Sequence, residues 1–337
     1  MKKVFTSLFV AFLVINAQAK IVYLNNNLEN PKISENLYTN WADAYAAASV
    51  GDTIYVVGSN FDYGRITIEK KLTVIGPGYF LEGNTQTQVD KKEAMFNQVT
   101  LKEGSDGTLI KGLSINGGYG LDISDQIDDI TIENNYCYDI TFNFRPQDIY
   151  NNISIKKCFI KSNLSMASGY DVVLSNLTLT NNFINGVSIE DGSTGIVSRN
   201  LFLGNDLKMG TSSSFEITDN IFLNDNVNSF TIQNLPDASV HNNISLTGAF
   251  GDANGNMTAP QSTLFTTDEN ATTDGQYMLS ESSPAKGAGT NGTDIGPFGG
   301  PDPYRLSGLP DLPNIYELST GGFVSGDEMP VQIKIKQ

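Results

Sequence analysis

From residue 110 onward, a short pattern of apolar and polar positions returns every 19 to 23 residues. Positions zero and plus five of the repeat are mostly apolar, and position plus three is largely asparagine. Position zero is occupied by Ile110, Ile132, Ile155, Leu174, Val197, Ile217 and Val240. A repeat this short cannot bury its own apolar face, so its copies must stack on one another. The pattern predicts a solenoid.

The repeat has the composition of short strands separated by asparagine-rich turns, without helical spacers. This predicts an all-β fold, a parallel β-helix with about 22 residues per coil, rather than a leucine-rich repeat. Asparagines that stack at about 4.8 Å from coil to coil can hydrogen-bond along the solenoid axis. We therefore expect position plus three to be a structural ladder and not a catalytic row.

Both ends of the chain differ from the repeats. Residues 38–50 predict a short helix with Trp41, Ala44, Tyr45 and Ala48 on one face, capped by Asn40 or Thr39. We expect this helix to precede the first strand and to cover the open end of the solenoid. The polar residues 82–93 predict a loop between coils. Residues 301–337 predict a proline-rich C-terminal cap or extension of a β-helix domain that spans residues 20–300, with one more strand in the alternating final stretch.

The first 19 residues have the features of a secretory signal peptide: a basic start, an apolar stretch and small residues before Lys20. Without them the chain keeps 19 basic and 37 acidic residues, a formal charge of −18. Nucleic acid needs a basic footprint, so it is excluded as a partner. We expect an exported monomer, periplasmic or extracellular, that does not insert into a membrane.

The two cysteines fall in different columns, Cys137 at plus five and Cys158 at plus three. We expect both to be small buried residues in adjacent coils, with a disulfide as the less favoured alternative.

Three segments and the repeats between them resemble a known group: WADAYAAASVGDTIYVVG near the start, the pair LTVIGPGYFLEGNTQTQ and GTLIKGLSINGG, and LSESSPAKGAGTNGTDIGPFGG near the end. The likeness is to secreted right-handed parallel β-helix proteins of the pectin lyase-like superfamily, of the kind found in Bacteroidetes-type bacteria. It covers most of residues 38–300 and implies the right-handed fold. It also implies a polysaccharide as the partner, without assigning a catalytic subfamily.

The superfamily's catalytic motifs match poorly. Asn60-Phe61-Asp62 and Asp128-Asp129 formally fit the N-x-D and D-D motifs of the polygalacturonase-like members, but G-H-G and R-x-K are missing. Lyase chemistry needs a cation for the uronate carboxylate and a base for the neighbouring proton. No arginine of the chain matches a lyase motif, so no catalytic residue is assigned by the resemblance.

Three groups of residues are candidate sites. The outward position plus one places charged residues on successive coils, which favours a surface charge ladder but leaves catalysis open for Lys111, Glu133, Lys156 and the single histidine, His241. A lengthened turn offers aromatic rings and hydrogen-bonding groups for a sugar platform: Tyr138, Phe142, Phe144, Arg145, Asp148 and Tyr150. The alternative is that these rings pack inward.

Acidic and amide side chains in two further loops could hold calcium, although chance strings of turn residues, which the loops of a solenoid produce readily, are the favoured explanation. The first loop contains Asp122, Asp125, Asp128 and Asp129, and the second contains Asp252, Asn254 and Asn256. Two hypotheses of function remain. The first is an exported β-helix protein that binds a polysaccharide, with cleavage left open. The second is a non-catalytic surface or adhesion module that binds glycan or protein.

Overall fold

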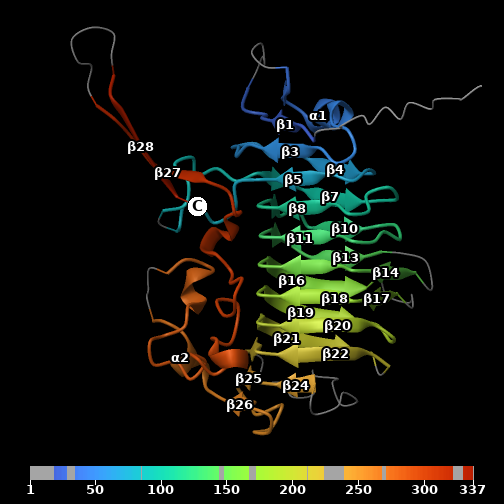
Figure 1. Cartoon of the computed structure of the whole chain (residues 1–337), viewed down its shortest axis with the longest axis vertical. Helices are drawn as coiled ribbons and strands as arrows, with labels where there is room; N and C mark the ends of the chain where they lie inside the picture. Colours follow the sequence, from blue (N-terminus) through green and yellow to red (C-terminus); the bar gives the residue numbers. More distant parts are fainter. Residues whose placement is uncertain are drawn as a thin grey trace, which may run out of the picture.

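Two long parallel sheets wind through the protein as a β-solenoid of about 8 turns with coils about 22 residues apart (Figure 1). The computed structural model describes residues 19–28, 35–84, 86–143, 148–166, 172–210, 212–223, 239–267, 271–321 and 329–336. The predicted all-β solenoid is therefore confirmed. The predicted signal peptide, residues 1–19, lies almost wholly outside the described residues.

The first sheet has 11 strands, whose spatial order is β2 (Leu37–Tyr38), β1 (Ile21–Leu24), β3 (Thr53–Val56), β5 (Thr73–Ile75), β8 (Leu109–Lys111), β11 (Thr131–Glu133), β15 (Ser154–Lys156), β18 (Leu177–Thr180), β20 (Thr194–Ser198), β22 (Ser214–Thr218) and β24 (Val240–His241). Each coil contributes one strand, and every pair in this sheet is parallel.

The second sheet has 13 strands. Ten of them follow the order β26 (Met257–Thr258), β25 (Ile244–Ser245), β23 (Ile221–Phe222), β21 (Leu201–Met209), β19 (Phe183–Ile189), β16 (Phe159–Met166), β13 (Ile140–Phe142), β10 (Leu121–Ile123), β7 (Gln98–Leu101) and β4 (Arg65–Ile68). The other three are β12 (Tyr136–Cys137), β9 (Ser114–Ile115) and β6 (Met95–Phe96). Strand β12 pairs with the first half of β16, β9 pairs with β12, and β6 pairs with β9. A separate parallel pair joins β14 (Ile149–Asn151) to β17 (Val173–Ser175).

One coil of the predicted register is wrong. Strand β15 pairs with β18 so that Ile155 lies opposite Leu179, whereas Leu174 lies opposite Tyr150 in the short third sheet. Position zero is therefore Leu179, and position plus three of that coil becomes Asn182. The extra strand β17 supplies an apolar residue with the same local spacing, and this explains why Leu174 fitted the pattern.

The asparagine ladder at position plus three is confirmed. The Nδ2 group of Asn200 donates to the carbonyl of Leu179 at 2.8 Å, and its Oδ1 accepts from the backbone N–H of Asn182 at 3.0 Å. The same pattern of bonds is repeated by Asn135, Asn182, Asn220, Asn243 and Asn256. These amides satisfy backbone groups that the turn buries away from water. Asn256, expected in a calcium loop, is the last rung of this ladder.

Position plus two is a tight corner with left-handed backbone in every regular coil. It is occupied by Gly112, Asn134, Lys157, Asn181, Arg199, Asp219 and Asn242, with φ between 54° and 71°. Asparagine and aspartate tolerate this region better than other non-glycine residues. Lys157 and Arg199 are less suited to it, and both take part in contacts with the C-terminal segment.

The N-terminal helix is confirmed as α1 (Trp41–Ala47), which lies at the upper end of the solenoid in Figure 1. Asn40 caps it by accepting from the backbone N–H of Asp43 at 3.0 Å. Ala44 and Ala48 pack into the main core. The expectation that the helix precedes the first strand is wrong, because β1 and β2 come earlier in the chain and extend the first sheet beyond β3.

Residues 257–267 and 271–313, which we call the C-terminal strap, fold back along the outside of the coils. The strap contains the short helix α2 (Gln261–Leu264) and the 3-10 turns η3 (Gly275–Tyr277), η4 (Thr290–Gly292) and η5 (Leu306–Gly308). It is bonded to successive corners. Asp219 accepts from the N–H of Thr290 at 2.8 Å, and Asn181 donates to the carbonyl of Pro297 at 2.8 Å. Lys157 donates to Asp302 at 2.7 Å.

Beneath the strap lies a second apolar core, formed by position plus four of the repeat. This position points out of the solenoid, and its apolar residues are Tyr136, Phe159, Phe183, Leu201, Ile221 and Ile244. The strap covers them with Leu264, Phe265, Ala285, Ile295 and Tyr304. The ring of Phe183 lies 4.7 Å from that of Tyr304, centroid to centroid. One outer face of the solenoid is thus closed to solvent.

The chain's last described strands form an antiparallel hairpin of β27 (Asn314–Thr320) and β28 (Val331–Lys336). The hairpin projects away from the coils in Figure 1. The final stretch is therefore a strand, as predicted, but it pairs within the hairpin and not with the solenoid.

Cys137 and Cys158 are both fully buried free thiols, which confirms the favoured reading. Burial raises the pKa of the Cys158 thiol to about 12.

Candidate functional site

Two residues of the predicted outward column at position plus one, Glu133 and Lys156, lie where the strap is attached to the coils. Glu133 is 8% exposed, and its Oε1 lies 2.7 Å from Nζ of Lys157 and 3.7 Å from Nζ of Lys156. Asp302 of the strap lies 2.7 Å from the same Lys157 ammonium. Burial lowers the pKa of Lys157, but its hydrogen bonds to Asp302 and Glu133 outweigh this effect and leave the pKa raised. Glu133, Lys156 and Lys157 therefore hold the strap to the coils.

Of the other two candidates in that column, Lys111 lies on the coil next to Glu133 and His241 lies far from the cluster. Lys111 is half-buried and is the strand partner of Glu133 in β11. His241 is half-buried at the far end of the first sheet, with Nε2 3.6 Å from Oε1 of Glu216. The structure does not bring His241 together with Lys111, Glu133 and Lys156, whose coils lie several strands away.

The predicted aromatic platform is divided by the structure. Phe142 and Tyr150 are fully buried and their rings contact each other edge to face at 5.2 Å, so neither presents a face to solvent. Phe144 and Arg145 lie outside the described residues. Asp148 is half-buried beside β14. Tyr138 remains at the surface, half-buried, with Nζ of Lys161 5.7 Å from its ring centroid.

The predicted calcium ligands of the first loop form bonds between coils. Asp128 accepts from the backbone N–H of Asn151 at 2.7 Å, Asp129 accepts from the amide of Asn152 at 2.8 Å, and Asp125 accepts from the N–H of Glu103 at 3.1 Å. In the second loop Asp252 and Asn254 are exposed. Within the described part of the chain, no three His, Cys, Asp or Glu side chains are grouped so that they could hold a metal ion.

A polar and aromatic surface outside the strap lies where the second sheet bends. Each coil turns here from its shorter strand, such as β12, into its longer arm, such as β13. We call this surface the bend face. It consists of Arg65, Tyr119, Asp122, Tyr138, Asp139, Lys161, Asn163 and Asn185. The bend places residues of successive coils side by side along the solenoid axis.

Two tyrosines of the bend face carry cations on their rings. Tyr119 is 59% exposed, and the guanidinium carbon of Arg65 lies 4.4 Å from its ring centroid. Tyr138 carries Lys161 of the following coil, with Nζ 5.7 Å from its ring centroid. Such contacts hold an exposed ring in one orientation. Further along, Asn163, Ser165, Asn185, Ser188 and Lys208 line a depression of about 210 Å³.

The bend face also carries two carboxylates, Asp122 and Asp139. Burial, and secondarily the charge of Asp122, raises the pKa of Asp139 above its usual value. The Oδ1 atom of Asp139 is buried without a hydrogen-bond partner among the described residues. Gly120 on the preceding coil makes room for it, because a Cβ atom there would lie 1.9 Å from this oxygen. Asp122 accepts from the hydroxyl of Ser124 at 2.7 Å.

Sequence reasoning identified Tyr138 and Asp122 but missed the rest of the bend face. The available signal was the G-G-Y-G turn around Tyr119, where an aromatic residue stands among glycines with nothing to bury it. Arg65, Asp139 and Lys161 carry no such signal, since each belongs to a different coil and only the register of the strands brings them together.

The chain matches no protein-family model, no curated protein sequence and no solved structure at a significant level. The assignment of the fold therefore depends on the strand pairing in the structure itself. None of the described helices is both long enough and apolar enough to cross a membrane.

Proposed function

We propose that this protein is an exported member of the pectin lyase-like β-helix proteins that binds a polysaccharide along its bend face. The observation that carries the proposal is the pair of tyrosine rings, Tyr119 and Tyr138, held at the surface beneath Arg65 and Lys161. Aromatic rings stack on sugar rings, and neighbouring carboxylates, amides and ammonium groups hydrogen-bond their hydroxyls.

The shape of the bend face suits a chain ligand. Its residues come from successive coils, and stacked coils repeat at about 4.8 Å. A long polymer can therefore meet the same kinds of groups at regular intervals, from Tyr119 to the depression at Asn163 and Asn185.

The charges favour a neutral polysaccharide over a polyanion. The bend face itself carries both signs, Arg65 and Lys161 beside Asp122 and Asp139, and the whole chain has a formal charge of −16. A polyanion would be repelled by this field and would need a local basic patch or a bound cation to overcome it.

Binding to a panel of neutral polysaccharides, measured by affinity electrophoresis, tests the proposal. We expect Tyr119→Ala and Tyr138→Ala each to weaken binding about tenfold, because a stacked aromatic pair contributes about 1 kcal/mol and the ring's buried area adds to it. Tyr23→Ala is the matched control: Tyr23 is 43% exposed, but it lies on β1 of the first sheet. Retention of full binding by both bend-face variants would contradict the proposal.

Cleavage at the same face is the second candidate, and the raised pKa of Asp139 beside Asp122 favours it. A general acid must keep its proton near the working pH. Release of reducing ends, and of unsaturated products that absorb in the ultraviolet, would be followed with and without calcium. Products that vanish in Asp139→Asn but persist in the Asp43→Asn control would support catalysis. If the native protein binds a glycan and releases nothing, it is a binding module.

A further inference from the structure

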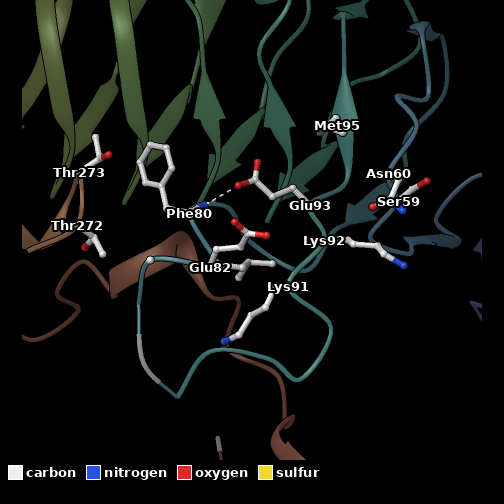
Figure 2. A pocket seen from close by; sticks show the side chains of 12 residues that line it. Ser59, Asn60, Phe80, Glu82, Lys91, Lys92, Glu93, Met95, Thr272 and Thr273 are labelled. Carbon is white, nitrogen blue, oxygen red and sulfur yellow. Dashed lines mark hydrogen bonds between the residues drawn. The ribbon is translucent and has the colours of Figure 1, made fainter. Parts of the chain in front are cut away.

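An open cavity of about 510 Å³ lies where three distant segments of the chain meet, and it shares no lining residue with the bend face (Figure 2). Ser59 and Asn60 come from the turn after β3, and Thr272 and Thr273 come from the C-terminal strap. The loop between β5 and β6 supplies residues 80–83 and 91–93, and Met95 begins β6. Its volume falls within the range of small-molecule sites.

A buried polar network holds the wall of this cavity in place. Asp274 is fully buried, and its carboxylate accepts from Asn84, Thr272, Tyr304 and the backbone N–H of Ser307 at 2.7–3.0 Å. The hydroxyl of Ser307 donates to the carbonyl of Phe80 at 3.0 Å. The loop and the strap are thereby locked together before any ligand arrives, as a binding site with rigid support requires.

Hydroxyl, amide and aromatic groups line the cavity beside two carboxylates. Figure 2 shows the carboxylates of Glu82 and Glu93 on the side of Phe80, while the ammonium groups of Lys91 and Lys92, which also line the cavity, point away from the two carboxylates. Glu93 is oriented by the N–H of Phe80, which donates to its Oε1 at 2.7 Å. Lys91 donates instead to the hydroxyl of Thr87 at 2.5 Å.

Neither carboxylate forms an ion pair with a described residue, although two lysines lie next to them in the chain. Both carboxylates are therefore available to a cationic ligand. Ser59, Asn60, Thr272 and Thr273 add neutral donors and acceptors at the rim, and Phe80 adds an apolar wall.

We propose that this cavity binds an amino sugar, with its ammonium group between Glu82 and Glu93 and its hydroxyls on the threonine and serine side. Charge-assisted hydrogen bonds to two carboxylates select the protonated amine over a neutral substituent. The site is separate from the bend face and does not depend on polysaccharide binding there.

Calorimetric titration of the full chain with glucosamine, glucose and N-acetylglucosamine tests this site. We expect glucosamine to bind at least about tenfold more tightly than either neutral sugar, because hydrogen bonds to charged groups exceed neutral ones by about this factor. Glu82→Gln removes one charge from an exposed position without disturbing the loop, and it should lose most of this preference. Glu93→Gln should do the same, with Glu103→Gln on an exposed turn as the matched control.

Equal binding of glucosamine and glucose by the native protein would overturn the proposal, as would unchanged glucosamine binding by Glu82→Gln. The test of this cavity can be distinguished from the test of polysaccharide binding at the bend face. Tyr119→Ala should keep its affinity for glucosamine, and Glu82→Gln should keep its affinity for polysaccharide.

Discussion

At the scale of single residues, the asparagines of position plus three explain how a chain can turn sharply inside a buried stack. Each turn leaves backbone N–H and carbonyl groups away from water, and one amide side chain satisfies such groups on the preceding coil while it bonds to the asparagine of the next coil. Asn200 alone bonds with Asn182, Asn220 and the carbonyl of Leu179. The side chain is therefore polar, fully buried and structural.

Replacing Asn200 with alanine should lower the free energy of unfolding by about 2–4 kcal/mol, because buried partners on both neighbouring coils lose their hydrogen bonds. Urea denaturation followed by circular dichroism measures the change. Asn116→Ala, at an exposed position outside the ladder, should change stability by less than about 0.5 kcal/mol. A similar small effect for Asn200→Ala would mean that water can replace the ladder.

At the scale of elements, the second sheet buries apolar residues on both of its faces over much of its length. Position plus five, such as Ile160 and Ile184, faces the solenoid core, and position plus four, such as Phe159 and Phe183, faces the strap. Consecutive apolar residues in a short strand are the pattern of a strand covered on both sides. The strap is thus part of the folded core and not a loose extension.

Phe183→Ala tests this role of the strap. Phe183 is fully buried although it points out of the coil, so its loss should cost about 3–5 kcal/mol, as for any core phenylalanine. The control Phe61→Ala removes a ring that is 66% exposed and should change the unfolding midpoint little. Equal, small effects of both variants in a thermal melt would show that the strap leaves that face of the sheet open in solution.

At the scale of the whole molecule, ion pairs fasten the returning strap to the middle of the solenoid. Lys157 is 2% exposed and lies between Glu133 of the coils and Asp302 of the strap. Asp311 of the strap lies 3.6 Å from the ammonium group of the same lysine. The strap joins coils that are far apart in sequence, so these contacts make the stack and its covering one cooperative unit.

Lys157→Met should lower the free energy of unfolding at neutral pH by about 2 kcal/mol. The loss falls below the 3–5 kcal/mol typical of a fully buried pair, because Asp302 is 60% exposed and Lys156 still faces Glu133. Lys156→Met, whose side chain is 31% exposed, is the matched control and should lose less.

The pH dependence of that difference has a defined sign. The folded-state pKa of Lys157 is raised above the ordinary value of 10.5, so its contribution is complete below that pH and is lost as the pH rises through the folded-state value. The stability gap between the native protein and Lys157→Met should therefore close above about pH 10.5 in urea titrations. A gap that stays constant through this range would mean that Lys157 acts by packing alone.

Local patterns in the sequence determined the parts of this protein that depend on near neighbours. The repeat predicted the solenoid, the asparagines predicted the ladder, and Asn40 predicted the start of the helix, because the period of a strand, the tolerance of a tight turn and a helix cap are properties of short segments. The two buried cysteines were predictable for the same reason.

Only the tertiary structure decided which surfaces remain open. The strand pairing puts Leu179, and not Leu174, at position zero of its coil. Phe142 and Tyr150 are buried, and Phe183 is covered by a strap that comes about a hundred residues later in the chain. The tertiary structure also brought Arg65 onto Tyr119, and Thr272 beside Glu82. These pairings depend on how many coils separate two residues. The number of residues between them does not reveal this, because an insertion such as residues 82–93 lengthens one coil without changing the local pattern of any strand.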